Sequence, residues 1–334
     1  MSGETKDFDN WYLSPKFAAF STGCSMIDIH FAPIQGYTDC VYRNAHHELA
    51  GGVSAYYTPF IRLEHGQVRR KDIRDISPDN NAGVPLVPQI IAANVQELSQ
   101  LTDVVRDCGY WRIDLNMGCP HPPQTGHGRG AGLFARPDAV REIMAGIASI
   151  QDMKFSVKMR LGMDNPDEWR SFIDILNDTP LEHITLHART ARQMYRGTPD
   201  LEAFDAFLQQ CRHRVIFNGG ITTAADIRKL EQRFPSLQAV MIGQGLLANP
   251  CLAMEYREGR QFTQAESQRM IMAIHDRIFS HASATLQGDA QILTHMQSFW
   301  RPLENAIDRK LWKKLVRTSS LANYRAQIGT IQME

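Results

Sequence analysis

Eight short apolar runs rich in β-forming residues recur along the chain, and segments with helical periodicity follow most of them. The helical segments include residues 135–150, 167–176, 201–211 and 222–234, and the last three begin at Asp, Pro-Asp or Thr-Thr capping signals. A strand followed by a helix, eight times over roughly 230 residues, predicts a (β/α)8 barrel. A doubly wound parallel sheet shows the same alternation and is the alternative, although the count of eight favours the barrel. The eight runs span residues 27–32, 53–60, 84–91, 111–116, 155–160, 183–188, 214–219 and 239–244.

Polar residues and glycines stand where most of these runs end. In a barrel the carboxyl ends of the strands meet at one rim, and that rim carries the active site. Two glycine-rich turns, Asn218-Gly219-Gly220 and Gly243-Gln244-Gly245, follow strands seven and eight, where barrels usually hold a phosphate group. The sequence therefore predicts a polar site at one end of the barrel, with a phosphate-binding part. The other candidates at the strand ends are Pro33, Gln89, Asn116, Cys119, Lys158, Arg160 and His187.

Each of these residues also has a purely structural explanation. Gln89 and Asn116 can be structural residues whose hydrogen bonds close the top of the barrel, and Lys158 can form an ion pair with a neighbouring acid. A single histidine such as His187 is more often a core residue with satisfied hydrogen bonds. Cys119 by itself is more often a small buried apolar residue than a reactive group. The prediction of a functional site depends on all of them lying at the same rim.

Charge balance and cysteine usage limit the classes of function. Lys and Arg number 36, as do Asp and Glu, so any surface for nucleic acid has to be a local patch. The six cysteines are scattered without a Cys-X-X-Cys pair, which speaks against a zinc site or a disulfide framework and for a reducing cytoplasm. No run is long and apolar enough for a transmembrane helix. Residues 1–26 lack the features of a secretory signal, and we expect them to form an extension outside the core fold.

The alternation of strand and helix stops after Gly259, so the barrel is expected to span residues 27–259. Residues 260–334 contain amphipathic helical segments, at 265–282, 292–307 and 309–324, and predict a separate helical domain. Five basic residues fall within nine positions of the last segment, next to Trp312. Such a run is either a solvated helix face or a surface for RNA. The five are Arg309, Lys310, Lys313, Lys314 and Arg317.

The stretch from Ile113 to Pro120, followed by Gln124 and by Gly130-Ala131, resembles the signature of the tRNA-dihydrouridine synthase family in both residue type and spacing. Seven further blocks resemble the family in the same order. The resemblance covers roughly residues 27 to 325. The blocks are FAPIQGYTD (31–39), PLVPQI (85–90), SVKMRLG (156–162), LHART (186–190), MYRG (194–197), FNGGI (217–221) and MIGQGLLANP (241–250).

The resemblance implies a flavin mononucleotide (FMN) across the mouth of the barrel, reduced by NADPH. The reduced flavin would pass a hydride to C6 of a uracil in tRNA, and Cys119 would protonate C5 from the opposite face. The glycines after Cys119 would make its loop mobile and open to RNA. The resemblance also implies flavin contacts from Pro33, Gln89, Lys158 and His187, phosphate contacts from Asn218, Gly220, Gly243, Gln244 and Gly245, and uracil contacts from Asn116, Arg160 and Tyr195.

Two positions depart from the family pattern. His121-Pro122-Pro123 stands where the family usually has a small residue and a lysine, and Gln244 stands where it usually has an arginine. The first departure leaves the modified uridine open, and with it the possibility of a reductase that acts on another RNA. An FMN barrel acting on a free pyrimidine and a non-catalytic RNA-binding relative are two more functions compatible with the sequence. We expect a cytoplasmic monomer that binds tRNA, without a metal site, a membrane or a protein partner.

Overall fold

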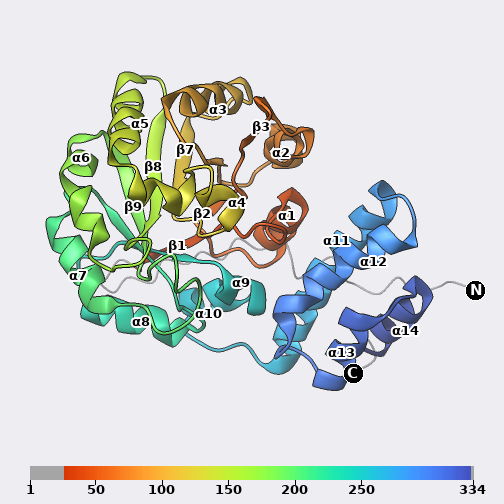
Figure 1. Cartoon of the computed structure of the whole chain (residues 1–334). Coiled ribbons are helices and arrows are strands. Elements are labelled where there is room, and N and C mark those ends of the chain that lie inside the picture. The colour runs from red at the N-terminus through yellow and green to blue at the C-terminus, as the bar shows by residue number, and fades with distance from the viewer. Residues whose placement is uncertain (1–25, 332–334) are drawn as a thin grey trace, which may run out of the picture.

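The strands form one closed parallel barrel, as expected (Figure 1). The computed structural model describes residues 26–331, so the predicted extension lies almost wholly outside the described residues. The strand order is β5-β2-β1-β11-β10-β9-β8-β7-β6. Strands β5 (Leu86–Val87) and β6 (Gln89–Ile90) are two parts of one segment interrupted at Pro88, which has no N–H to donate. Because β5 pairs with β2 and β6 pairs with β7, the eight predicted strands close into a ring, and the doubly wound alternative is wrong.

All eight predicted runs contain strands, and the elements between them follow the predicted order. The remaining barrel strands are β1 (Asp28–Phe31), β2 (Ala55–Tyr57), β7 (Arg112–Met117), β8 (Lys154–Arg160), β9 (Leu181–His187), β10 (Val215–Asn218) and β11 (Ala239–Ile242). The barrel helices are α1 (Cys40–Leu49), α3 (Val95–Asp107), α5 (Pro137–Ser149), α6 (Ile173–Asp178), α7 (Leu201–Gln210), α8 (Ala224–Arg233), α9 (Gln244–Ala248) and α10 (Leu252–Glu258).

The capping signals explain where two of these helices begin. Asp200 accepts a hydrogen bond from the N–H of Ala203 at 2.9 Å and caps α7. Thr223 forms a reciprocal capping box with Asp226 at the start of α8. The third predicted start differs, because the Asp167 carboxylate accepts a hydrogen bond from Arg170 instead of capping the backbone. The segment 167–176 therefore begins with a 3-10 turn, η3 (Glu168–Ser171), before α6.

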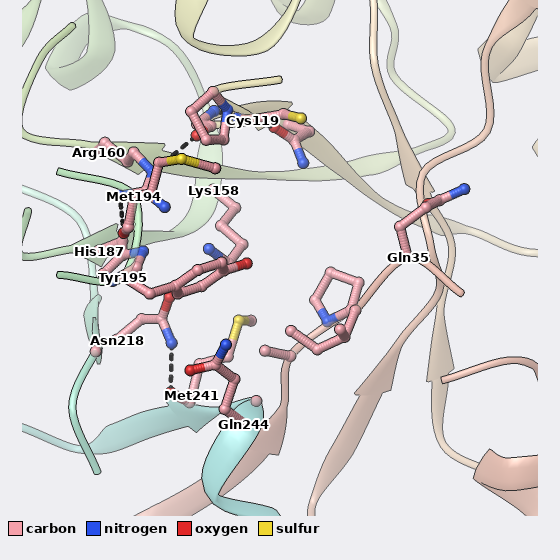
Figure 2. A pocket seen from close by; sticks show the side chains of 18 of the residues that line it. Gln35, Cys119, Lys158, Arg160, His187, Met194, Tyr195, Asn218, Met241 and Gln244 are labelled. Atoms are coloured by element: carbon pink, nitrogen blue, oxygen red, sulfur yellow. Dashed lines mark hydrogen bonds between the residues drawn. The ribbon is translucent and has the colours of Figure 1, made fainter. Parts of the chain in front are cut away.

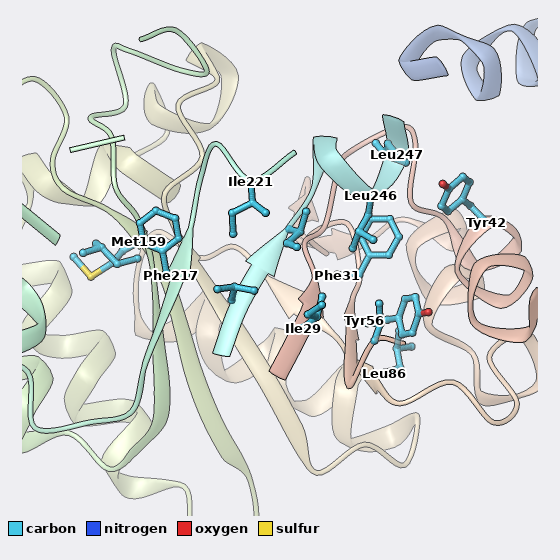
Figure 3. Packing of buried hydrophobic residues seen from close by; sticks show 14 of the residues in the cluster. Ile29, Phe31, Tyr42, Tyr56, Leu86, Met159, Phe217, Ile221, Leu246 and Leu247 are labelled. Carbon is cyan, nitrogen blue, oxygen red and sulfur yellow. The ribbon is translucent and has the colours of Figure 1, made fainter. Parts of the chain in front are cut away.

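Strand alternation divides the buried side chains between two regions. Apolar residues that face outward, such as Ile29, Phe31 and Phe217, pack under the surrounding helices in one large core (Figure 3). A smaller apolar cluster, Ala32, Ala55, Tyr57, Val87, Ile216, Ala239 and Met241, fills the inside of the barrel. The barrel interior also holds polar residues, because Asp114 and Asn116 alternate with the outward-facing Ile113 and Leu115 along β7. These interior polar residues lead up to the rim.

The segment between β2 and β5 is the part of the barrel that no sequence pattern predicted. It contains a short hairpin, β3 (Leu63–Glu64) with β4 (Gln67–Val68), and α2 (Arg70–Ile76). The buried Arg43 of α1 holds the segment by donating to the Asp75 carboxylate at 3.0 Å and to Asn81 Oδ1 at 2.9 Å. The carboxylate satisfies the buried guanidinium charge, which would otherwise be costly.

Four helices follow the barrel and lie at one side of it, next to α1 (Figure 1). They are α11 (Gln264–Thr285), α12 (Asp289–Trp300), α13 (Arg309–Arg317) and α14 (Leu321–Ile331). The predicted segment 292–307 stops being helical at Trp300 because Pro302 follows in a 3-10 turn, η4 (Arg301–Leu303). The predicted segment 309–324 is divided between α13 and α14. Between residues 26 and 331, no helix combines the length and apolar character needed to cross a membrane.

The buried Tyr324 hydroxyl joins three of these helices. Trp300 Nε1 donates to it at 2.8 Å, and it lies 2.7 Å from His275 Nε2. Substitution of Tyr324 by Phe leaves the indole N–H buried without an acceptor, so we expect the free energy of unfolding to fall by about 1–3 kcal/mol. Chemical denaturation measures this change. Tyr195→Phe is the control, since the Tyr195 residue is 51% exposed. Equal stability of both variants would show that the buried hydroxyl contributes nothing.

Candidate active site

A cavity of about 770 Å³ lies at the carboxyl ends of the strands, inside the rim of the barrel. Every candidate residue from the sequence lines it, so the structure brings together all the positions on which the prediction depended. Figure 2 shows Lys158 and Tyr195 reaching into the cavity, with Cys119 on one side and Gln244 on another. The thirteen residues are Pro33, Gln89, Asn116, Cys119, Lys158, Arg160, His187, Tyr195, Asn218, Gly220, Gly243, Gln244 and Gly245.

Asn116, near the end of β7, holds the turn that carries Cys119. Its side-chain Oδ1 accepts hydrogen bonds from the backbone N–H groups of Gly118 at 3.0 Å and Cys119 at 2.8 Å. Its Nδ2 donates to Gln89 Oε1 at 2.8 Å. A side-chain oxygen that accepts backbone N–H groups two and three residues ahead fixes a tight turn. The thiol of Cys119 is therefore mounted on a defined backbone.

The loop after Cys119, which was expected to be an open stretch, contains regular structure. It forms a short helix, α4 (Pro122–Thr125), and a 3-10 helix, η2 (Gly130–Ala135). Gly130 has a φ of 58°, and a Cβ added there would lie 2.8 Å from the Cys119 carbonyl oxygen. The N–H of Ala131 donates to that same oxygen at 3.0 Å. The glycine is needed for this close approach of the two segments, which explains the glycine without any need for mobility.

Arg160 on β8 ties this loop to the loop after β9. Its buried guanidinium donates to three backbone carbonyls, those of Gly118 at 2.9 Å, Thr190 at 2.9 Å and Met194 at 2.8 Å. Burial lowers the pKa of Arg160 to about 10, so it remains cationic at neutral pH. The family resemblance implies that Arg160 contacts the substrate base. Within the described residues, its contacts hold the backbone of two loops in place.

Lys158 and His187 both line the cavity, but Lys158 is charged and His187 is neutral at neutral pH. Among residues 26–331, no hydrogen bond or ion pair reaches the Lys158 ammonium group, and burial lowers its pKa to about 8. The described residues therefore contain no acid that pairs with Lys158, contrary to the structural explanation considered above. Burial also lowers the pKa of His187, which makes it neutral. Its Nε2 lies 3.1 Å from Arg189 Nη1, which only donates, so the proton of His187 resides on Nδ1.

Cys119 is a protonated thiol under neutral conditions. Burial raises its pKa above the ordinary value, while the charges of Arg160 and Lys158 act in the opposite direction and favour the thiolate. The net result is a thiol that keeps its proton and that has two cations nearby when the proton leaves. This combination suits a group that donates a proton during a reaction.

The two glycine-rich turns lie against other parts of the protein so closely that a side chain would not fit. A Cβ on Gly219, whose φ is 125°, would lie 2.9 Å from His187 Cδ2, and one on Gly245 would lie 2.2 Å from the Ile221 oxygen. Asn218 Nδ2 donates to the Met241 carbonyl at 2.7 Å and joins the strands that carry the two turns. Both turns line the cavity, and turns of this type bind anions through backbone N–H groups in other proteins.

Several residues of the cavity wall were missed by the sequence analysis. Arg189, inside the LHART block, lies beside the first glycine-rich turn: a Cβ built on Gly219 would be 3.2 Å from its Nη1. Its position two residues after His187 was the available signal. Arg62 comes from the unpatterned segment between β2 and β5, and Phe60 ends the predicted run 53–60, but no motif marked either residue as part of a site. Met194 lines the cavity in a left-handed conformation, with a φ of 53°.

The sequence is similar to known proteins over most of its length. The family model "Dihydrouridine synthase (Dus)" matches residues 30–324. "Probable tRNA-dihydrouridine synthase" of Staphylococcus epidermidis is 26% identical over 314 residues, which cover 90% of this chain and 92% of that protein. "Probable tRNA-dihydrouridine synthase 2" of Bacillus subtilis is 27% identical over 254 residues, covering 73% of this chain and 77% of its own length.

Two solved structures share the barrel at low identity. Morphinone reductase superposes with a TM-score of 0.52 at 10% identity and covers 71% of this chain and 87% of its own. Histamine dehydrogenase from Rhizobium sp. 4-9 has the same TM-score at 14% identity, covering 75% of this chain and 48% of its own. These likenesses concern the fold alone. The match to the family model spans nearly all of the described residues, and the chain belongs to the dihydrouridine synthase family.

Proposed function

We propose that this protein reduces uridine to 5,6-dihydrouridine in tRNA, with FMN as its bound cofactor and NADPH as the electron source. One observation carries the proposal: a protonated thiol on a fixed turn lines a cavity that also holds two glycine-rich turns and a lysine with no partner among residues 26–331. FMN, when bound, would supply the hydride that uracil C6 receives. The family match and the curated relatives support the same substrate.

The residues of the cavity fit FMN. Lys158 offers a cation to the electron-rich N1–C2 edge of the ring, and Gln89, His187 and the backbone at Pro33 would hold the ring. The glycine cradles at Asn218-Gly219-Gly220 and Gly243-Gln244-Gly245 would take the phosphate through their N–H groups. Gln244 adds no charge there. Arg189, next to the first cradle, supplies the cation that Gln244 lacks.

Cys119 would donate the proton that uracil C5 receives. Its proton is retained at neutral pH, and Arg160 and Lys158 stabilise the thiolate left after transfer. The thiolate then recovers a proton from water, so the overall reaction consumes uridine, NADPH and one proton and yields dihydrouridine and NADP+. Tyr195, half exposed at the rim, would contact the base together with Asn116 and Arg160.

The helices after the barrel would bind the tRNA. The basic residues of α13 are all exposed, while Leu311, Trp312 and Leu315 turn inward, and Trp312 Nε1 donates to the Trp300 carbonyl at 2.8 Å. Trp312 is therefore a packing residue, and the charges alone form the contact surface. We assign residues 27–259 to the catalytic barrel and residues 260–334 to an RNA-binding domain, since α10 ends at Gly259 with a φ of 71°. A cytoplasmic monomer fits this role.

A reductase of a free pyrimidine is the competing function. A reductase of another RNA is a variant of the proposed tRNA activity. A free pyrimidine needs no exposed cationic helix, so α13 favours RNA. Mass mapping of dihydrouridine in RNA from cells with and without this gene separates the three, because it reports which RNA and which position loses the modification.

Substitution of Cys119 by Ala tests the proton donor. We expect uridine reduction in tRNA to slow by roughly 10²–10⁴-fold, the usual loss when a general acid is removed. FMN content and the rate of NADPH oxidation should stay near those of the parent, because neither needs the thiol. Cys211→Ala, at a half-buried cysteine after α7, is the matched control. Parent-like uridine reduction by Cys119→Ala would make Cys119 a packing residue, and a protein that cannot bind FMN would remove the proposed function.

A triple substitution of Lys310, Lys313 and Lys314 by Gln tests the RNA surface. If all three contact phosphate on a duplex-like stem, the slope of log affinity against log salt should flatten by about two to three units. Flavin reduction by NADPH should be unchanged, since it occurs in the barrel. Filter binding across a salt series measures the slope.

The control for this surface removes the same number of charges elsewhere. Arg106 is half-buried, and Lys154 and Arg212 are exposed; all three lie near the amino ends of the barrel strands, away from the cavity. Their joint change to Gln should leave the slope as in the parent. An unchanged slope in the α13 variant would make its basic face a solvated surface.

A further inference from the structure

Asp114 is a buried carboxylate that the proposed reaction does not use. It lies inside the barrel on β7, two residues before Asn116, and does not line the cavity. Its Oδ1 accepts a hydrogen bond from Ser156 Oγ at 2.6 Å, and its Oδ2 accepts one from Gln89 Nε2 at 2.7 Å. A fully buried acid needs a reason to be there, because an apolar residue would cost less desolvation.

The hydrogen bonds above Asp114 form a chain with one direction. A carboxylate only accepts, so Gln89 has to present its Nε2 to Asp114 and its Oε1 to the next residue. Asn116 then has to donate its Nδ2 to Gln89, at 2.8 Å, which leaves its Oδ1 for the turn. That oxygen accepts the N–H groups of Gly118 and Cys119. The direction set at Asp114 thus reaches the backbone of Cys119 through two side-chain amides.

Side-chain amides have nearly the same shape in their two orientations, so only their partners decide which end faces where. If Gln89 turned over, Asn116 would follow, and its NH2 group would face the N–H groups of Gly118 and Cys119. Donors would then oppose donors in a buried place, and the turn would open. The two N–H groups thus fix the orientation of the amides at the top of the chain, and an acceptor at its base that cannot donate fixes the same orientation from below.

We propose that the Asp114 carboxylate is a positioning residue, which fixes the orientation of the Gln89 and Asn116 amides and thereby holds the turn that carries Cys119. Burial raises the pKa of Asp114 to about 6, while Ser156, Gln89 and the charge of Lys158 favour its ionised form. The carboxylate therefore prevails at pH 8. The consequence for catalysis rests on the proposed function, whereas the consequence for the turn does not.

The test uses Asp114→Asn, Ser156→Ala and their combination, in the full chain at pH 8. In Asp114→Asn the new oxygen can accept from Gln89, because the Ser156 hydroxyl is able to accept from the new NH2 group. In Ser156→Ala the carboxylate still only accepts. Each single variant therefore keeps the direction of the chain. In the double variant the new amide is no longer restricted to accepting from Gln89, so only the N–H groups of Gly118 and Cys119 oppose a reversal of the two amides.

Three measurements follow the turn and the chemistry separately. Hydrogen exchange of the Gly118 and Cys119 amides reports the bonds to Asn116, and alkylation of Cys119 by iodoacetamide, located by peptide mass, reports access to the thiol. Both work on the protein without FMN. The rates of uridine reduction and of flavin reduction by NADPH report the two halves of the reaction. Tyr57→Phe is the matched control, since it removes buried hydrogen bonds to His30 and His183 elsewhere in the barrel interior.

We expect the single variants and the control to stay within about threefold of the parent in exchange, alkylation and uridine reduction, because the direction of the hydrogen-bond chain is kept in each of them. The double variant should exchange the two amides and alkylate Cys119 about tenfold or more faster, and should reduce uridine about tenfold or more slowly, because the two sites are coupled. Flavin reduction should change little in every variant.

Two results would overturn the proposal. One is parent-like exchange at Gly118 and Cys119 in the double variant. The other is loss of protection in Asp114→Asn alone, since the hydrogen-bond directions are intact there. A failure of the proposed function is distinct: the parent would then not reduce uridine, while exchange and alkylation would still decide the role of Asp114.

Discussion

Closure of the parallel sheet at Pro88 is the constraint on which the site depends. The segment on either side of this residue pairs with β2 through Leu86 and Val87 and with β7 through Gln89 and Ile90. Pro88 cannot donate to the ladder, but its carbonyl accepts the N–H of Asp114 at 2.9 Å. Closure therefore sets Gln89 opposite Asp114 in the interior. An open sheet would leave Gln89 and Asp114 on separate edges, and the polar residues of the rim would not converge.

Most of the fold follows from local patterns, and so could be predicted. Strand and helix periodicity are properties of a few neighbouring residues, as are the caps at Asp200 and Thr223. The candidate residues converge because strand ends meet in any closed barrel. The segment between β2 and β5 could not be predicted, since it depends on the buried Arg43 and its long-range partners Asp75 and Asn81.

Glycines and arginines at the rim were harder to interpret, because the same residue type can either contact a ligand or hold the protein's own backbone in place. Gly130 suggests freedom in the sequence, yet the structure uses its missing side chain to press the backbone against Cys119. Arg160 suggests contact with a ligand, yet it donates to three carbonyls of the protein itself. Only the neighbours in space distinguish these interpretations. Burial lowers the pKa values of His30 and His183 in the barrel interior, so these side chains are neutral. Lys158 at the rim keeps a pKa of about 8 and is a cation at neutral pH.

The charges on α13 give this molecule an electrical asymmetry that its composition hides. With equal numbers of acidic and basic side chains, the protein has no net attraction for a polyanion at long range. Lys310, Lys313, Lys314 and Arg317 nevertheless share one exposed helix face, so positive charge is concentrated at one place on the surface. At physiological salt the field of such a patch extends over about 8 Å. A patch with this range would orient a polyanion in the final encounter, and would not draw it in from a distance.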